Sequence, residues 1–187
     1  EYIERAESLR STLGGLEPAD DADTTQATHE VWAISGNQGI TSRTKQLIEG
    51  ATNELILVIG HESVYTDQLI TQLKSAETRN VTIFIGTVNE KLKRRVQDAF
   101  PEATVFVSGL DWLRQSPFAG DSTEISRLLL VDREAILVSS FTETGDSSRE
   151  HQKGVFGRGF NNGLVAIARR LMATGLPSVD DLEDDTS

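Results

Sequence analysis

The sequence contains no cysteine, and this absence excludes several kinds of site at once. Disulfide bonds, thiol nucleophiles, iron–sulfur clusters and zinc sites with cysteine ligands all need this residue. Histidine is nearly as scarce, because its three copies, His29, His61 and His151, lie far apart along the chain. We therefore expect neither a metal site nor any other cofactor.

Long apolar runs are absent as well. No stretch approaches the roughly 18 apolar residues that a helix needs to cross a bilayer. Residues 1–16 are charged and helix-like, unlike the apolar centre of a secretory signal. The expectation is a cytoplasmic protein with no membrane partner.

Methionine occurs once, at Met172, and the first residue is Glu1. Because translation starts at methionine, we expect these 187 residues to be a piece of a longer protein whose missing part lies upstream. The function of the whole protein then depends partly on residues before Glu1.

Basic residues are outnumbered, since 18 Lys and Arg stand against 29 Asp and Glu, which gives a net charge of −11. A surface this acidic repels phosphate backbones, so the chain by itself is not expected to bind nucleic acid non-specifically. Lysine is much rarer than arginine, and an acidic, lysine-poor composition favours a halophile as the source. An ordinary acidic cytosolic protein is the alternative.

Apolar residues near the N-terminus recur at alternating spacings of four and three, the pattern by which two helices pack along each other. They are Tyr2, Ala6, Leu9, Leu13 and Leu16. The pattern predicts a coiled-coil-like helical linker over residues 1–16 that dimerises the chain. Because Gly14 and Gly15 interrupt it, a short amphipathic helix lying on its own domain stays open as an alternative. Residues 17–29 are predicted to be an acidic linker, and residues 177–187 a disordered acidic tail.

Residues 30–176 alternate short apolar runs with amphipathic helical patterns. The nearly continuous apolar runs at Glu54–Gly60 and Val81–Gly86 indicate strands buried on both faces. This rhythm predicts an α/β domain with a mostly parallel sheet flanked by helices. Two later apolar runs surround Asp132–Glu134 and predict a β-hairpin. The glycine-rich stretch Gly154–Gly163 is expected to be either a mobile loop near the ligand cleft or a connection into the last helix.

The predicted hairpin carries Ile125, Arg127 and Asp132 along its first strand, and Ser139 and Ser140 in its second. This frame resembles the catalytic motif of the phospholipase D superfamily, His-x-Lys-x4-Asp, whose second strand ends near Gly-Ser. Isoleucine replaces the nucleophilic histidine and arginine replaces the lysine, so only the aspartate is kept. Since isoleucine has no lone pair to attack phosphorus, and no second copy of the motif is found, we expect no enzymatic activity and no catalytic residue. The alternative is a phosphodiesterase or nuclease in which two protomers compose one site.

A second resemblance extends over roughly Val31–Leu176. The stretch VWAISGNQGITSRTKQLIEGATNELILVIG has a Trp-x-Ile strand, a glycine and an Ile/Arg helix that ends in alanine before the next strand. It is similar to the start of the effector domain of TrmB-family archaeal transcriptional regulators, which also carries the Leu-Leu-Val-Asp hairpin. The resemblance implies a degenerate phospholipase D-like half fold, preceded by a winged-helix domain and a helical dimerisation linker.

The same resemblance implies partners. It implies a homodimer that senses a small molecule, a sugar or related metabolite, and that binds DNA only through the winged-helix domain missing from this chain. Some members carry an additional C-terminal sugar-binding β-domain, which we expect to be absent here because the chain ends soon after Leu176. Without that domain, the identity of the sensed molecule is left open.

Candidate ligand-binding residues follow from the predicted sheet, because ligands of open parallel sheets bind beyond the carboxyl ends of the strands. They are His61, Glu62, Ser63, Gly86, Thr87, Arg127 and Ser140. His61 and Glu62 suit hydroxyls or an amine, and Arg127 suits a carboxylate or phosphate. The alternatives are that His61 caps the following helix and that Arg127 forms an ion pair with Asp132 or Glu124. For the whole chain, a third hypothesis is a structural dimerisation domain that binds no ligand.

Overall fold

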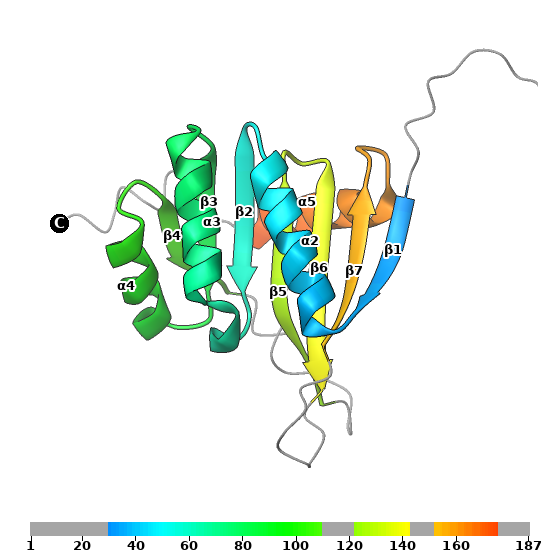
Figure 1. The fold of residues 1–187 in the computed structure, drawn as a ribbon, viewed down its shortest axis with the longest axis horizontal. Coiled ribbons are helices and arrows are strands. Elements are labelled where there is room, and N and C mark those ends of the chain that lie inside the picture. The colour runs from blue at the N-terminus through cyan, green and yellow to red at the C-terminus, as the bar shows by residue number, and fades with distance from the viewer. Residues whose placement is uncertain (1–29, 110–121, 143–151, 176–187) are drawn as a thin grey trace, which may run out of the picture.

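The computed structural model describes residues 30–109, 122–142 and 152–175, which form a seven-stranded sheet with helices on both faces (Figure 1). The strand order is β1-β7-β6-β5-β2-β3-β4. The strands are β1 (Glu30–Ser35), β2 (Glu54–Ile59), β3 (Thr82–Thr87), β4 (Thr104–Val107), β5 (Thr123–Val131), β6 (Ala135–Thr142) and β7 (Lys153–Arg158). The helices are α2 (Asn37–Gly50), α3 (Asp67–Thr78), α4 (Glu90–Ala99), α5 (Gly163–Gly175) and the short 3-10 helix η1 (Glu62–Val64). The expected helical linker at 1–16, the acidic linker at 17–29 and the tail at 177–187 lie outside the described residues.

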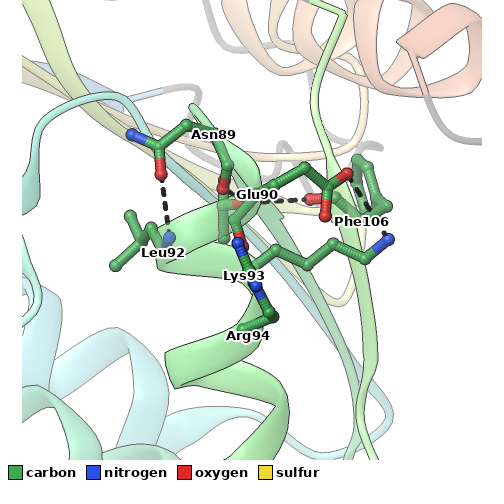
Figure 2. Close-up of polar contacts among 7 residues, drawn as sticks. Asn89, Glu90, Leu92, Lys93, Arg94 and Phe106 are labelled. Carbon is green, nitrogen blue, oxygen red and sulfur yellow. Dashed lines mark hydrogen bonds and ion pairs between the residues drawn. The ribbon is translucent and has the colours of Figure 1, made fainter.

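Three neighbouring strands, β2, β3 and β4, run parallel, and α3 and α4 connect them as the sequence pattern predicts. Side-chain caps define where these helices begin. The Thr66 hydroxyl accepts a hydrogen bond from the Leu69 N–H at 3.3 Å, and the Asn89 side chain accepts one from the Leu92 N–H at 2.8 Å (Figure 2). Both caps lie just beyond the carboxyl ends of the preceding strands, which is the edge where the candidate site was expected.

The sheet is mixed, so the prediction of a mostly parallel sheet is wrong. β5 lies antiparallel to β2, and β6, β7 and β1 continue the antiparallel pairing to the edge. β1 and β2 do run in the same direction, as a β–α–β unit requires, but three strands lie between them. A continuous apolar run shows that a strand is buried on both faces, and it carries no information about the direction of its neighbours.

The glycine-rich stretch forms a strand rather than a loop. Within it, β7 pairs with both β6 and β1, and α5 begins only at Gly163. Two of its glycines allow helices to approach the sheet closely. A Cβ atom on Gly154 would lie 3.3 Å from the Ile40 side chain of α2, and one on Gly157 would lie 3.2 Å from Leu164 of α5. Glycine lowers the strand signal of a sequence, which is why this strand was missed.

Each face of the sheet has its own apolar core. Helices α2, α3 and α4 cover one face and α5 covers the other (Figure 1). Alternate residues of the central strands serve the two cores, so that Leu57 and Leu129 pack beneath α2 and α3, while Ile56 and Leu128 pack beneath α5. None of the described helices is long and apolar enough to cross a membrane.

Candidate functional site

Arg127 lies in the middle of β5, and its side chain contacts α2, the helix that packs on that face of the sheet. Its Nη1 donates a hydrogen bond to the Thr44 hydroxyl at 2.8 Å, and that hydroxyl in turn donates to the Ile40 carbonyl at 2.8 Å. The neighbour of Arg127 on β2 is Ile59, the last residue of that strand. The guanidinium therefore lies near the carboxyl ends of the parallel strands, as the sequence argument expected.

The environment of Arg127 is unusual for a cation. The residue is 6% exposed, and no ion pair joins it to any residue of the described part, Asp132 and Glu124 included. Its Nε has no hydrogen-bond partner there. Burial lowers the pKa of Arg127 to about 10, which still leaves the guanidinium charged at neutral pH. A buried charge normally has a counter-ion, and here the described residues supply none.

A cavity of about 270 Å³ opens beside Arg127, between α2, η1, the start of α3 and the sheet. Its wall is largely polar and includes Asn37, Thr41, Thr44, Ser63, Gln72 and Gln152. Among the described residues that form the wall, Arg127 alone is charged. Gln152 is 8% exposed, and its Oε1 has no hydrogen-bond partner among the described residues. The cavity thus combines a buried, unpaired donor with a buried, unpaired acceptor.

The segment His61–Ser63 follows β2 and borders this region. The His61 Nδ1 accepts a hydrogen bond from the Ser63 N–H at 3.2 Å and lies 2.8 Å from the Ser63 hydroxyl, so His61 caps η1. Its ring packs edge-on against Phe141, with the ring centroids 4.8 Å apart. Glu62 lies 3.6 Å from Arg95 of α4, as a solvent-exposed ion pair. Of these three residues, Ser63 is the one that forms part of the cavity wall.

The remaining candidates lie outside the cavity wall. The Thr87 hydroxyl can donate its proton to either of two backbone carbonyls, that of Phe106 at 3.2 Å or that of Asn89 at 3.3 Å (Figure 2 shows Asn89 and Phe106). Gly86 lies against the Phe106 ring, which a Cβ atom would approach to 3.1 Å. Ser140 lies on β6, where it pairs with Ile125 and Lys153. The structure therefore brings Ser63 and Arg127 together in one cavity and places His61, Glu62, Gly86, Thr87 and Ser140 elsewhere.

Sequence reasoning missed the residues that complete the wall, above all those on α2. Asn37, Thr41 and Thr44 recur at spacings of four and three, which places them on one face of the helix. Thr44 is buried among the apolar residues Ile40, Leu47 and Ile48 of α2, and such a polar stripe within a buried face is itself a sign of a site. Gln72 on α3 and Gln152 before β7 gave no such signal.

Asp132, the residue that the phospholipase D-like frame keeps, lies far from the cavity at the opposite end of β2. Its carboxylate accepts hydrogen bonds from the N–H groups of Thr52, Asn53 and Glu54 at 2.8–3.0 Å, and from the Thr52 hydroxyl at 3.0 Å. Burial would raise the pKa of Asp132, but these hydrogen bonds outweigh it and lower the pKa. The neighbouring Arg133 forms a two-bond ion pair with Glu54, both at 3.0 Å. The turn therefore anchors the hairpin to β2.

The other two positions of the frame are separated by a β-bulge. Ile125 pairs with Ser140 and Arg127 pairs with Ser139, so Ser126 is an extra residue. As a result, Ile125 packs against the core beneath α5, whereas Arg127 faces α2. The bulge is held by the Ser126 carbonyl, which accepts from the N–H groups of Gly60 at 2.9 Å and His61 at 3.2 Å. In the described part, no three His, Asp or Glu side chains form a group that could hold a metal ion.

The chain is similar to known proteins in structure rather than in sequence. No family model matches the chain, and no curated protein matches it by sequence. The archaeal chromatin protein TrmBL2 superposes with a TM-score of 0.53 at 19% identity, covering 92% of this chain and 62% of the TrmBL2 chain. NucT from Helicobacter pylori superposes with a TM-score of 0.53 at 12% identity, covering 79% of this chain and 95% of NucT.

A phospholipase D family member, Nuc from Salmonella typhimurium, gives a TM-score of 0.49 at 13% identity, covering 78% of this chain and 91% of Nuc. At such identities a likeness establishes the fold alone. The chain shares its fold with TrmBL2 and NucT. The chain spans 62% of the length of the TrmBL2 chain.

Proposed function

We propose that this chain is the effector and dimerisation part of a TrmB-like transcriptional regulator, and that it binds a small molecule in the Arg127 cavity without cleaving phosphodiesters. The resemblance of residues 31–176 to the effector domains of TrmB-family regulators supports the regulator class. The superposition on the chromatin protein TrmBL2, which covers 92% of the chain, supports a shared fold. DNA binding belongs to a winged-helix domain outside this chain, in keeping with the net charge of −11.

The observation that carries the proposal is the separation of Ile125 from Arg127. A phospholipase D-like reaction needs a nucleophile beside the cationic residue that holds the phosphate. Here the nucleophile position holds a hydrocarbon side chain that packs into the core beneath α5, and the cation lies on the other face. What the fold keeps is a cationic cavity suited to binding.

Binding in this cavity can be transmitted because its walls belong to different elements. α2 contributes Asn37, Thr41 and Thr44, while η1 and α3 contribute Ser63 and Gln72. A ligand that contacts both sides stabilises one spacing of α2 and α3 over another. A differential affinity of about 1–3 kcal/mol between two such states is typical of allosteric coupling. α2 follows β1, and the predicted acidic linker at residues 17–29 joins β1 in sequence to the proposed dimerisation linker at residues 1–16.

The decisive experiment uses the full-length protein. We expect a winged-helix domain before Glu1, a dimer by analytical ultracentrifugation in high salt, and DNA binding that changes when the cavity is occupied. A monomer whose gene encodes no winged helix would contradict the regulator proposal. Turnover of bis(p-nitrophenyl) phosphate by the purified chain would favour the phosphodiesterase alternative. A dimer whose thermal stability responds to none of a broad set of sugars, sugar phosphates and amino acids would favour the ligand-free structural alternative.

A further inference from the structure

We infer that the molecule held in the Arg127 cavity is a small hydroxylated anion, bound through a phosphate or carboxylate group at Arg127 and through a hydroxyl at Gln152. This inference rests on the proposed function in that it takes this cavity as the ligand site. It narrows the ligand from any sugar-like metabolite to one with a negative charge.

The first argument is the missing counter-ion. Arg127 is 6% exposed and keeps its charge at neutral pH, yet its one hydrogen bond within the described residues goes to the neutral Thr44 hydroxyl. A guanidinium has several more N–H donors, arranged as a fork that matches carboxylate or phosphate oxygens. The protein has 29 acidic and 18 basic residues, yet this cation has no acidic neighbour among the described residues of the cavity wall. An anion bound from solution supplies the counter-ion that the described residues do not provide.

The second argument is the buried acceptor. The Gln152 Oε1 is unpaired inside a wall that otherwise consists mainly of hydroxyl and amide groups, such as Asn37, Thr41 and Gln72. A deprotonated carboxylate has acceptors only and cannot satisfy a carbonyl oxygen, whereas a hydroxyl group donates to it. The amides and hydroxyls around it offer both donors and acceptors, which suits a molecule with several hydroxyls. The unpaired Arg127 Nε and Gln152 Oε1 therefore suit a ligand with an anionic end and a hydroxylated end.

The N-terminus of α2 adds to the preference for negative charge. α2 has 14 residues, and its N-cap is Gly36, so no side chain caps its first turn, which also contains no acidic residue. Its first residue, Asn37, forms part of the cavity wall, as does Thr66, the N-cap of α3. The uncapped N-terminus of α2 thus borders the same cavity as the buried guanidinium and favours an anion there. The first turn of α3 is capped by the Thr66 hydroxyl and already contains Asp67, so it adds nothing to this preference.

The test compares one carbon skeleton in three charge states. Thermal unfolding of the chain is followed in glucose, glucose 6-phosphate and gluconate, with inorganic phosphate as the minimal anion and with KCl keeping the ionic strength constant. We expect glucose 6-phosphate or gluconate to raise the midpoint, by about 5 °C or more at a hundredfold its dissociation constant. Glucose should raise it far less. Midpoints that respond to none of the three anions, or equally to glucose, would overturn the inference.

Substitutions of Arg127 test whether the stabilising anion binds in this cavity. Arg127→Gln should weaken the binding of the responding anion at least tenfold, and Arg127→Lys should weaken it less, because it keeps the charge but loses the fork. Arg94→Gln is the matched control, since Arg94 is an exposed arginine of α4 and lies outside the cavity wall. An anion response that survives Arg127→Gln would show a general charge effect and contradict the site.

The outcome separates this inference from the proposed function. If the full-length protein dimerises and binds DNA in response to a neutral sugar alone, the regulator stands and the anion inference fails. If the anions bind through Arg127 while the full-length protein neither dimerises nor binds DNA, the anion site stands and the regulator fails.

Discussion

Ile125 and Arg127 are two residues apart on β5, yet their side chains lie on opposite faces of the sheet. In a regular strand, residues at this spacing share a face. The bulge at Ser126 reverses the relationship, because Ile125 and Arg127 pair with the adjacent residues Ser140 and Ser139. The frame that resembles a catalytic motif in sequence is thereby divided in space into a core residue and a cavity residue.

This division predicts that restoring the histidine does not restore catalysis. Ile125→His places an imidazole against the apolar core beneath α5, away from Arg127. We expect no turnover of bis(p-nitrophenyl) phosphate above the unsubstituted chain, and a loss of about 1–3 kcal/mol in the free energy of unfolding because a polar ring replaces a half-buried hydrocarbon. Measurable hydrolysis by the variant would show that the two positions can share a site after all.

A second prediction concerns the glycine that the bulge requires. A Cβ atom on Gly60 would overlap the Ile125 carbonyl oxygen, so the backbone must move to admit it. We expect Gly60→Ala to lower the free energy of unfolding by about 2–3 kcal/mol, measured by urea denaturation.

The matched control for that variant is Gly50→Ala at the end of α2, where no atom lies within 4 Å of the added Cβ. It should leave stability unchanged or raise it by about 0.4–1 kcal/mol, because alanine restricts the unfolded chain. If both variants lose the same free energy, the close approach of Gly60 to β5 is not what limits substitution there.

The hairpin could be predicted from the sequence, whereas the bulge within it could not. The two apolar runs around Asp132–Glu134 predict the hairpin correctly, because strand length, apolar content and a turn are all local properties. The bulge depends on Gly60 and His61 of another segment, whose N–H groups share the Ser126 carbonyl, and no local pattern encodes that pairing. A prediction from spacing alone therefore placed positions 125 and 127 together.

The candidate site was predicted in part for a similar reason. Arg127 and Ser63 were found because each chain segment near a strand end could be examined by itself. Thr44 and Gln152 belong to the cavity only because α2 lies over β5 and because β7 is inserted beside β6. Strand order is a long-range property, so the partners that it supplies could not be read from periodicity.

A third prediction is the pH dependence of the Asp132 anchor. The hydrogen bonds from Thr52, Asn53 and Glu54 lower the pKa of the folded carboxyl below its unfolded value of about 3.9. The unfolded chain therefore binds the proton more readily, and the stabilisation is fully present above about pH 4 to 5 and is lost as the pH falls through the lower, folded pKa. We expect Asp132→Ala to lower the free energy of unfolding by about 1–2 kcal/mol at neutral pH.

Asp132→Asn measures how much the negative charge of the Asp132 carboxylate contributes to stability. Asparagine tolerates the left-handed backbone of this position, where φ is 51°, and keeps one acceptor oxygen. The difference in unfolding free energy between the unsubstituted chain and Asp132→Asn should shrink as the pH is lowered from about 6 towards about 2 in urea titrations. A difference that stays constant over this range would show that the carboxylate charge contributes nothing to the anchor.

The last prediction tests whether Arg127 stabilises the fold or instead binds a ligand in the cavity. A residue that stabilises the fold loses free energy of unfolding when it is replaced, whereas a buried cation without a counter-ion is a cost that replacement removes. We expect Arg127→Met, in the absence of ligand, to be as stable as the unsubstituted chain or more stable by up to about 1–2 kcal/mol. Burial lowers the pKa of Arg127 to about 10 in the folded chain, below its value in the unfolded chain, so at higher pH the folded chain releases a proton that the unfolded chain retains. Stability of the unsubstituted chain relative to Arg127→Met should therefore rise above about pH 10.

A double-mutant cycle with Thr44→Val completes the test, since the valine removes the hydroxyl that accepts from Arg127. Thr44→Val should cost about 1–3 kcal/mol when Arg127 is present, because the guanidinium then loses its hydrogen bond while staying buried. The same substitution should cost far less in the Arg127→Met background, where no guanidinium donor is left unpaired. If Arg127→Met itself lowers the free energy of unfolding by more than about 1 kcal/mol, Arg127 is a structural residue and its orphaned Nε needs no ligand to explain it.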